Sequence, residues 1–152
     1  MAGNAEMKRA FPAAPIVIGP GDAPMLTDAA LNLSAAYGLP VVSPPADQLV
    51  TEGDTLTFAG IDLEVFDIPG HSPGHVVYLI RATTPFTVLG GDVLFRGSVG
   101  RCDFPGGSFE VLKAGIERVL WPLPADTVVY PDHGPVTTVG HEKRTNPFLV
   151  GE

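Results

Sequence analysis

Residues 55–92, TLTFAGIDLEVFDIPGHSPGHVVYLIRATTPFTVLGGD, decide the fold class. Apolar and polar side chains alternate on both sides of Ala59–Gly60, which is the two-residue period of a strand with one buried face. This pattern predicts a β-hairpin over 56–68, with two further strands at 75–81 and 86–90. The centre of the chain is therefore expected to be a largely antiparallel sheet.

Helical patterns flank this sheet on both sides. Residues 2–10 are rich in good helix formers, and the apolar run at 15–19 predicts a short buried strand. A second helix is expected from Thr27 to Gly38, and a third over 108–121, where Ser108 is the cap and apolar residues recur at helical spacing. A last strand is expected at 127–130. Helices before, between and after strands indicate a layered α/β (α+β) protein.

The composition limits the possible functions. The chain has 152 residues, with 9 Lys and Arg against 17 Asp and Glu, so its formal charge is −8. This balance argues against nucleic acid as a partner, because a phosphate backbone requires clustered cations. No apolar run is long enough to span a membrane, no signal peptide is recognisable, and a lone cysteine excludes an internal disulfide. We expect a single cytoplasmic domain over 1–152, with no membrane partner.

Three side chains follow predicted strands and could carry chemistry. His71 lies in a Pro/Gly-rich corner after one strand, Asp92 follows the glycine pair that ends another, and His133 lies in the corner after the last. Two imidazoles and one carboxylate are a donor set that suits zinc, or a non-haem iron site with open positions. The spacing alone does not force these groups together, and each could instead satisfy backbone groups of its own turn.

Five stretches in order resemble the metallo-β-lactamase-fold hydrolases, and within them the glyoxalase II-like (hydroxyacylglutathione hydrolase-like) branch. They are PGHSPGH (69–75), GGDVLF (90–95), GSVGRCDFPGG (97–107), VYPDHGPVTT (129–138) and EKRTNPF (142–148). The resemblance covers residues 1–149. It implies an αββα sandwich that carries up to two metal ions at one edge of its sheets.

The resemblance also implies roles for single residues. His71 resembles a ligand of one metal, His133 a ligand of the second, and Asp92 the carboxylate that bridges both and takes part in catalysis. Zinc is the expected metal, with iron as the alternative. His75 and Asp132 are expected to lie behind these ligands and support them, although packing would also explain His75 and a turn role would explain Asp132.

The implied substrate is a small thioester such as an acyl-glutathione, cleaved by a metal-bound hydroxide. Four cationic side chains could hold its negative charge, although surface solvation would also explain them: Arg96, Arg101, Lys143 and Arg144. One alternative is an iron-dependent persulfide dioxygenase, a sister branch that the GSVGRCDFPGG stretch also resembles. Another is a non-catalytic homologue that binds a partner or associates with itself.

One signature of the family, His-x-His-x-Asp-His, does not occur in this sequence. The first predicted helix resembles the one that normally follows this motif, so we expect the C-terminal part of an N-terminally truncated sandwich, with poor activity alone. A start codon assigned too late, a genuine short homologue, or a site completed by another chain would each explain why the motif is missing. A sheet that lacks its neighbours should expose an apolar edge, which predicts self-association into a homo-oligomer.

Overall fold

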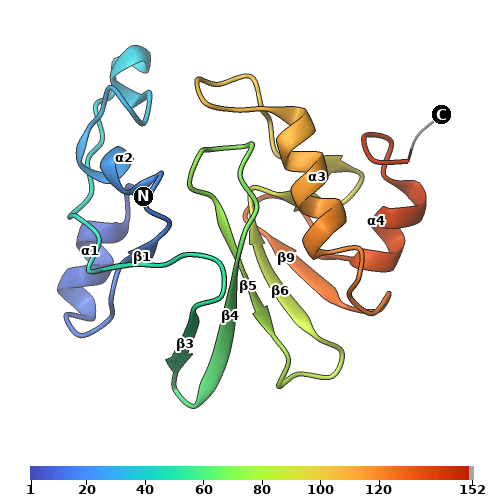
Figure 1. The fold of residues 1–152 in the computed structure, drawn as a ribbon. Helices are drawn as coiled ribbons and strands as arrows, with labels where there is room; N and C mark the ends of the chain where they lie inside the picture. Colours follow the sequence, from blue (N-terminus) through green and yellow to red (C-terminus); the bar gives the residue numbers. More distant parts are fainter. Residues whose placement is uncertain (151–152) are drawn as a thin grey trace. The chain divides into compact units, whose positions relative to one another are not determined.

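The computed structural model describes residues 1–150 and forms two compact units, which divide after Val50 (Figure 1). Each unit is built from the elements expected of a mixed α/β protein, so the predicted fold class is confirmed at that level. The expectation that all 152 residues form one domain stays a prediction. None of the helices within the described residues is long and apolar enough to span a bilayer.

The N-terminal unit contains short elements only. They are α1 Asn4–Ala10, β1 Val17–Ile18, α2 Ala23–Thr27, the 3₁₀ helix η1 Ser34–Tyr37 and β2 Gln48–Leu49. The two strands pair in parallel. The helix expected at 2–10 is confirmed, whereas the strand expected at 15–19 shortens to two residues that are half-buried.

The helix expected from Thr27 to Gly38 is wrong. A helix ends at Thr27 instead of starting there, because Pro24 provides an earlier start in the first turn of α2. The Asp28 carboxylate then accepts hydrogen bonds from the backbone N–H groups of the next turn, which competes with helix formation. Leu33 adopts a left-handed conformation with φ of 66°, so a continuous helix cannot pass through it. Gly38 ends the 3₁₀ turn, as predicted.

The C-terminal unit is built on a six-stranded sheet in the order β10-β9-β6-β5-β4-β3. β6 and β9 pair in parallel, and the other neighbours pair antiparallel. The strands are β3 Thr55–Phe58, β4 Ile61–Asp67, β5 Val76–Ile80, β6 Thr87–Gly91, β9 Val128–Pro131 and β10 Thr137–Thr138. The predicted hairpin is confirmed: Ala59 and Gly60 both have positive φ, as a tight two-residue turn requires.

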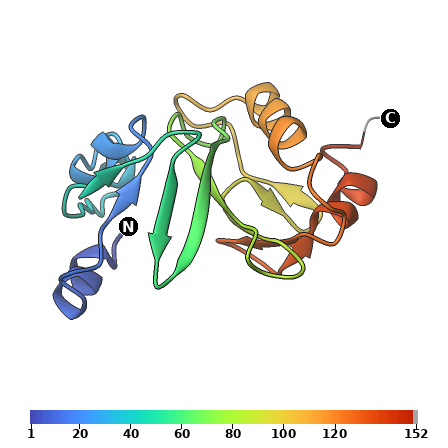
Figure 2. The same cartoon turned by 60° about the horizontal axis from the view of Figure 1, so that its bottom comes forward.

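Two helices and a small hairpin complete this unit. They are α3 Phe109–Val119, α4 Val139–Thr145 and the antiparallel pair β7 Leu94–Phe95 and β8 Ser98–Val99. Figures 1 and 2 show α3 along one face of the sheet and α4 on its β9 side. The Ser108 hydroxyl caps α3 by accepting the N–H of Val111, as predicted.

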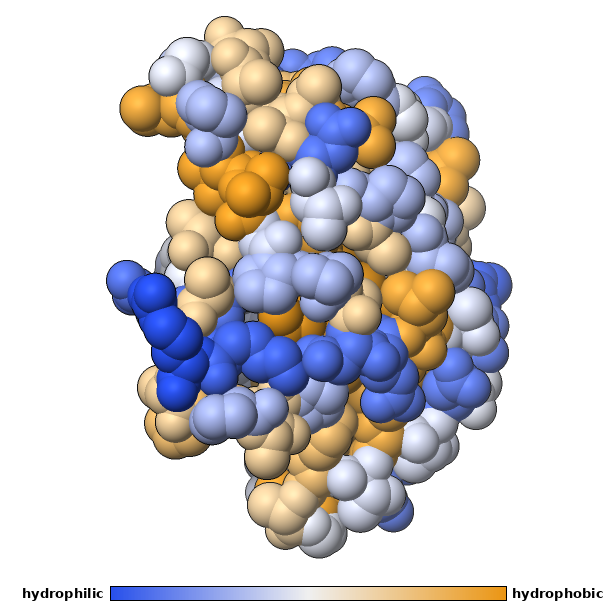
Figure 3. Space-filling view, turned by 90° about the vertical axis from the view of Figure 1, so that its left-hand side faces the viewer, coloured by the Kyte–Doolittle hydropathy of each residue, from blue (hydrophilic) through white to orange (hydrophobic). Residues whose placement is uncertain are grey.

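The core lies between α3 and the sheet. Leu112 and Ile116 of α3 are fully buried against Val77 and Val88 of the central strands. The opposite face of the same strands is partly exposed to solvent, since Leu89 on that face is 39% exposed. Figure 3 shows one side of the molecule, on which hydrophobic patches are divided by a hydrophilic band. Self-association through an apolar edge stays a prediction.

Candidate metal centre

Three loops meet at one edge of the six-stranded sheet. β4, β6 and β9 run in the same direction, because β4 and β6 are both antiparallel to β5 and β9 is parallel to β6. Their C-terminal ends therefore lie at the same edge. His71 follows β4, Asp92 follows β6 and His133 follows β9.

The structure brings these three side chains together around one carboxylate. His71 Nε2 lies 3.6 Å from Asp92 Oδ2, and His133 Nε2 lies 3.5 Å from Asp92 Oδ1. Both distances are too long for a good hydrogen bond. Two ligands of one tetrahedral zinc ion, with bonds of 2.0–2.1 Å, lie about 3.3 Å apart. Each imidazole nitrogen and its carboxylate oxygen are therefore spaced like two ligands of one ion.

The His71 ring is oriented by the backbone of a second loop. Its Nδ1 lies 2.9 Å from the carbonyl oxygen of Arg101, and a carbonyl can only accept, so Nδ1 carries the proton. In the neutral ring the lone pair of Nε2 then faces Asp92, an arrangement that a cation between them would stabilise. Ring N–H donation to a backbone carbonyl is typical of histidines that bind metals.

The backbone of Asp92 is fixed by a hydrogen bond to His75. The backbone N–H of Asp92 donates to His75 Nε2 at 3.1 Å, and the His75 ring lies edge-on to that of His71 with centroids 6.1 Å apart. Gly91, with φ of +51°, permits this approach, because a Cβ there would lie 2.7 Å from the His75 ring. Gly100 is similarly required, since a Cβ would collide with the Asp92 carbonyl oxygen.

Comparison with known proteins agrees with this arrangement of loops. Residues 1–133 match the metallo-beta-lactamase superfamily. The chain belongs to this superfamily. Hydroxyacylglutathione hydrolase GloC of Haemophilus influenzae is 41% identical over 116 residues, which are 74% of this chain and 53% of that protein. The chain spans about half to two thirds of the length of the curated relatives it matches.

Solved structures of the metallo-beta-lactamase fold superpose on the chain. The BLEG-1 B3 metallo-beta-lactamase has a TM-score of 0.89 and 39% identity, covering 96% of this chain and 69% of that one. TTHA1623 in a di-iron-bound form has a TM-score of 0.80 and 40% identity, covering 97% of this chain and 71% of that one. The predicted fold family is therefore confirmed, and metal binding is a property of its members.

The donor set fits a metal only in part. Within residues 1–150, no group of three or more His, Cys, Asp or Glu side chains is arranged to enclose an ion. The three candidates instead offer two donor pairs that share Asp92, and a pair leaves positions of a tetrahedral ion open. Asp92 and His71 are mostly buried, with 25% and 23% of their side chains exposed, whereas His133 is 77% exposed.

The loop that carries Asp132 and His133 is contacted from β6 and β7. The Phe95 ring packs edge-on against His133, with centroids 6.1 Å apart. Asp132 is exposed, and its backbone N–H donates to the Gly91 carbonyl at 3.1 Å, which is a turn contact. A supporting role for the Asp132 carboxylate stays a prediction.

The four cationic candidates have different neighbours. The Arg101 guanidinium makes two hydrogen bonds of 2.8 Å to Asp103, which lower the pKa of that carboxyl, and it lies over the Phe104 ring. Arg96 and Arg144 are exposed. Lys143 donates to the carbonyl of Trp121 at 3.3 Å. Roles in substrate binding stay predictions for all four, and Arg101 is the one whose backbone touches a candidate ligand.

The lone cysteine is not an activated nucleophile. Burial raises the pKa of the Cys102 thiol, and the nearby carboxylates of Asp103 and Glu110 raise it further. Its thiol instead donates to the Gly100 carbonyl at 3.2 Å. A thiol with a raised pKa is a poor nucleophile near neutral pH.

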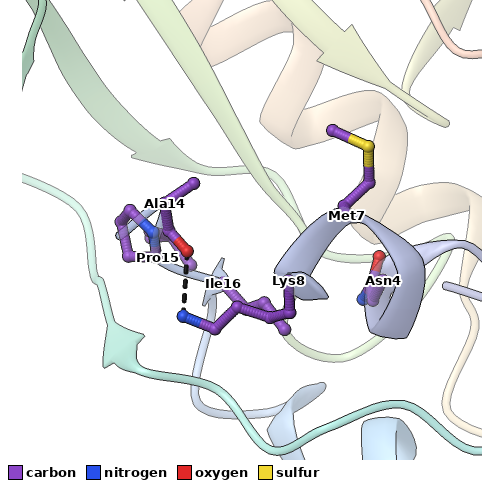
Figure 4. Close-up of a pocket in the computed structure, with 7 residues that line it drawn as sticks. Asn4, Met7, Lys8, Ala14, Pro15 and Ile16 are labelled. Carbon is purple, nitrogen blue, oxygen red and sulfur yellow. Dashed lines mark hydrogen bonds between the residues drawn. The ribbon is translucent and has the colours of Figure 1, made fainter. Parts of the chain in front are cut away.

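A hollow of about 310 Å³ in the N-terminal unit carries no candidate for catalysis (Figure 4). Lys8 is the charged side chain that lines it, and its ammonium donates to the Ala14 carbonyl at 2.9 Å and pairs with Asp47 at 2.9 Å. The Ile16 N–H and then Lys8 lower the pKa of Asp47. These contacts join α1 to the strand that follows it.

Two features of the site were not predicted from the sequence. The Arg101 group that orients His71 is a backbone carbonyl, which any residue would supply. Glu142 and Asn146 are fully buried beside β7–β8, although they lie in a polar stretch typical of a solvated tail. The EKRTNPF motif, which contains both, was the available signal.

Proposed function

We propose that this chain carries part of the active site of a metal-dependent hydrolase of the glyoxalase II type, which cleaves a small thioester such as an acyl-glutathione. The observation that carries the proposal is the placement of His71 and His133 on opposite oxygens of Asp92. The 41% identity to a hydroxyacylglutathione hydrolase supports the choice of substrate class.

His71, Asp92 and His133 would hold the metal, with His71 fixed through Arg101 and Asp92 fixed through His75. A bound zinc or iron ion would polarise the thioester carbonyl and lower the pKa of a water molecule. Asp92 would accept a hydrogen bond from the attacking water and keep it directed at the carbonyl carbon. The leaving group is a thiolate, which can depart without being protonated, so the reaction requires no general acid on the other side of the substrate.

The substrate's negative charge would be held by exposed cations on the loops that border the site. Arg96 directly follows Phe95, whose ring packs on His133, so the Arg96 side chain begins one residue away from a contact with a candidate ligand. Arg101 would take part only if it released Asp103. Lys143 and Arg144 belong to α4 and are proposed as secondary anchors.

An iron enzyme is the second candidate. Two histidines and one carboxylate are the donors of non-haem iron centres, and a solved relative with 40% identity is a di-iron-bound form. The activity in that case would be oxygen-dependent oxidation of a glutathione persulfide. Oxygen consumption with a persulfide, compared with thiol release from a thioester, separates the two reactions.

Elemental mass spectrometry of the purified chain tests the metal site. We expect bound zinc or iron that is lost in His71→Ala, His133→Ala and Asp92→Asn and is retained in the control Asp62→Asn, an exposed carboxylate near the start of β4, whereas His71 follows the end of that strand. Thioester hydrolysis measured on the same samples should follow the metal. A parent chain that folds but binds neither ion would contradict the proposal and favour a non-catalytic binding role.

A further inference from the structure

A carboxylate outside the proposed site is fully buried. Glu142 of α4 has no exposed surface, and three donors of the C-terminal unit surround it. The Thr137 hydroxyl donates to Oε1, while the Gly97 N–H and the Asn146 amide each donate to Oε2 at 2.9 Å. Burying a carboxylate is costly unless it is hydrogen-bonded in this way, so the cluster fixes its members relative to one another.

Asn146 extends the cluster to the same turn. Its amide nitrogen also donates to the Ser98 carbonyl at 2.9 Å, and the residue is fully buried. Gly97 lies in the turn that joins β7 to β8, and Ser98 is the first residue of β8. The N–H of Gly97 and the carbonyl of Ser98 are therefore held by the side chains of Glu142 in α4 and of Asn146, the residue after α4.

The hairpin that is held in this way contacts all three proposed ligands. Asp92 precedes β7, and the Arg101 carbonyl after β8 accepts the His71 Nδ1 proton. Phe95 of β7 packs against the His133 ring. Gly100 donates to the Val93 carbonyl at 3.2 Å, which closes the base of the hairpin next to Asp92. A shift of the turn would therefore move the groups that place each ligand.

We propose that Glu142 and Asn146 are positioning residues of the metal site, which they set by fixing the 92–101 hairpin. The inference rests on the proposed function for its metal, but the placement of His71 by the hairpin can be measured without one. This proposal gives a role to the two buried polar residues of the C-terminal tail, which are neither proposed metal ligands nor candidates for substrate binding.

Glu142→Gln tests the proposal in the full chain. The substitution keeps the size of the side chain but removes its negative charge and one of its two acceptor oxygens, so the charge-assisted hydrogen bonds that hold the hairpin are weakened. Glu117→Gln, on the exposed surface of α3, is the matched control. We expect zinc affinity, measured by competition with a fluorescent chelator, to fall on the order of 10–100-fold in Glu142→Gln and to stay unchanged in the control.

A second readout separates positioning from general stability. In the metal-free protein, ¹⁵N NMR should show a slowly exchanging Nδ1 proton on His71 that is lost in Glu142→Gln under conditions where circular dichroism reports a folded chain. If that variant does not fold, Asn146→Ala, which retains the bond between Glu142 and Gly97, should show a smaller loss of both affinity and signal. A folded variant with unchanged affinity and an unchanged His71 signal would overturn the proposal.

The outcomes also distinguish this inference from the proposed function. If the parent chain binds no zinc but its His71 signal depends on Glu142, the positioning is upheld and the metal function fails. If the parent binds zinc and Glu142→Gln binds it equally well with the His71 proton retained, the metal function stands and the positioning role is wrong.

Discussion

In the N-terminal unit, Leu26 and Val50 are the buried large apolar residues among residues 1–50, whereas the C-terminal unit buries a continuous apolar cluster between Ile68 and Leu149. The first unit leaves long apolar side chains in water, such as Leu39, which is 74% exposed. The second covers a six-stranded sheet with α3. Hydrophobic burial is thus the main stabilising contribution in one unit and a minor one in the other.

Polar side chains hold the first unit together. The Asn32 amide donates to the carbonyls of Met25 and Val41, and its oxygen accepts the Ser34 N–H. Lys8 and Asp47 connect α1 with the strand after it. Hydrogen bonds of this kind each contribute little net stability, so a unit that depends on them should open more readily than one with a core.

The largest expected effect comes from removing apolar volume under α3. Ile116→Ala should lower the free energy of unfolding of the C-terminal unit by about 2–5 kcal/mol, because the side chain is fully buried and leaves a cavity. Trp121 follows α3 and is the chain's one tryptophan, so its fluorescence in a urea titration reports on this unit. Val111→Ala, 46% exposed on the same helix, is the control. Equal losses in both variants would mean that α3 is not packed as described.

A smaller and local effect is expected in the other unit. Asn32→Ala removes the three hydrogen bonds that its side chain makes to backbone groups and should lower the local free energy of opening by about 1–3 kcal/mol. Hydrogen exchange followed by mass spectrometry should show faster exchange confined to residues 1–50, with the Trp121 unfolding curve unchanged. Leu39→Ala, an exposed site in the same unit, is the control. Faster exchange after Val50 as well would show that the two units do not open separately.

The same contrast explains what the sequence could predict. Alternating apolar residues around Ala59–Gly60 and the helical spacing after Ser108 predicted β3, β4 and α3, because each element buries one face in a shared core. Between Thr27 and Gly38 the helical spacing of apolar residues was misleading. There the backbone conformation follows the hydrogen bonds that the Asp28 carboxylate accepts and the Asn32 amide donates, and such bonds leave no periodic pattern in the sequence.

The site divides along similar lines. His71, Asp92 and His133 could be proposed because each follows a predicted strand, and sheet topology then brings strand ends to one edge. The groups that orient these three side chains were harder to predict from the sequence. The Arg101 carbonyl is independent of side-chain identity, and the Glu142 carboxylate accepts a hydrogen bond from a turn 45 residues away in the sequence.

The smallest expected effect concerns a charge pair within the C-terminal unit. Arg118 of α3 donates two hydrogen bonds to Glu52, of 2.7 and 2.8 Å, and these lower the pKa of Glu52 from its ordinary value of 4.5. A lowered pKa in the folded state means that the stabilisation is present above that ordinary value and is lost as the pH falls through the folded value. Both side chains are more than a third exposed, at 39% and 51%, so the contribution should stay below about 1 kcal/mol.

Glu52→Gln should therefore reduce the difference in unfolding free energy between about pH 7 and about pH 3 by that small amount, measured by urea titration of Trp121 fluorescence. Glu117→Gln, one residue from Arg118 on the same helix, should leave the difference unchanged. A loss comparable with that of Ile116→Ala would mean that the charge pair, and not the buried face of α3, holds this helix on the sheet. The contrast between a unit stabilised by its core and a unit stabilised by polar contacts would then fail at the helix on which it most depends.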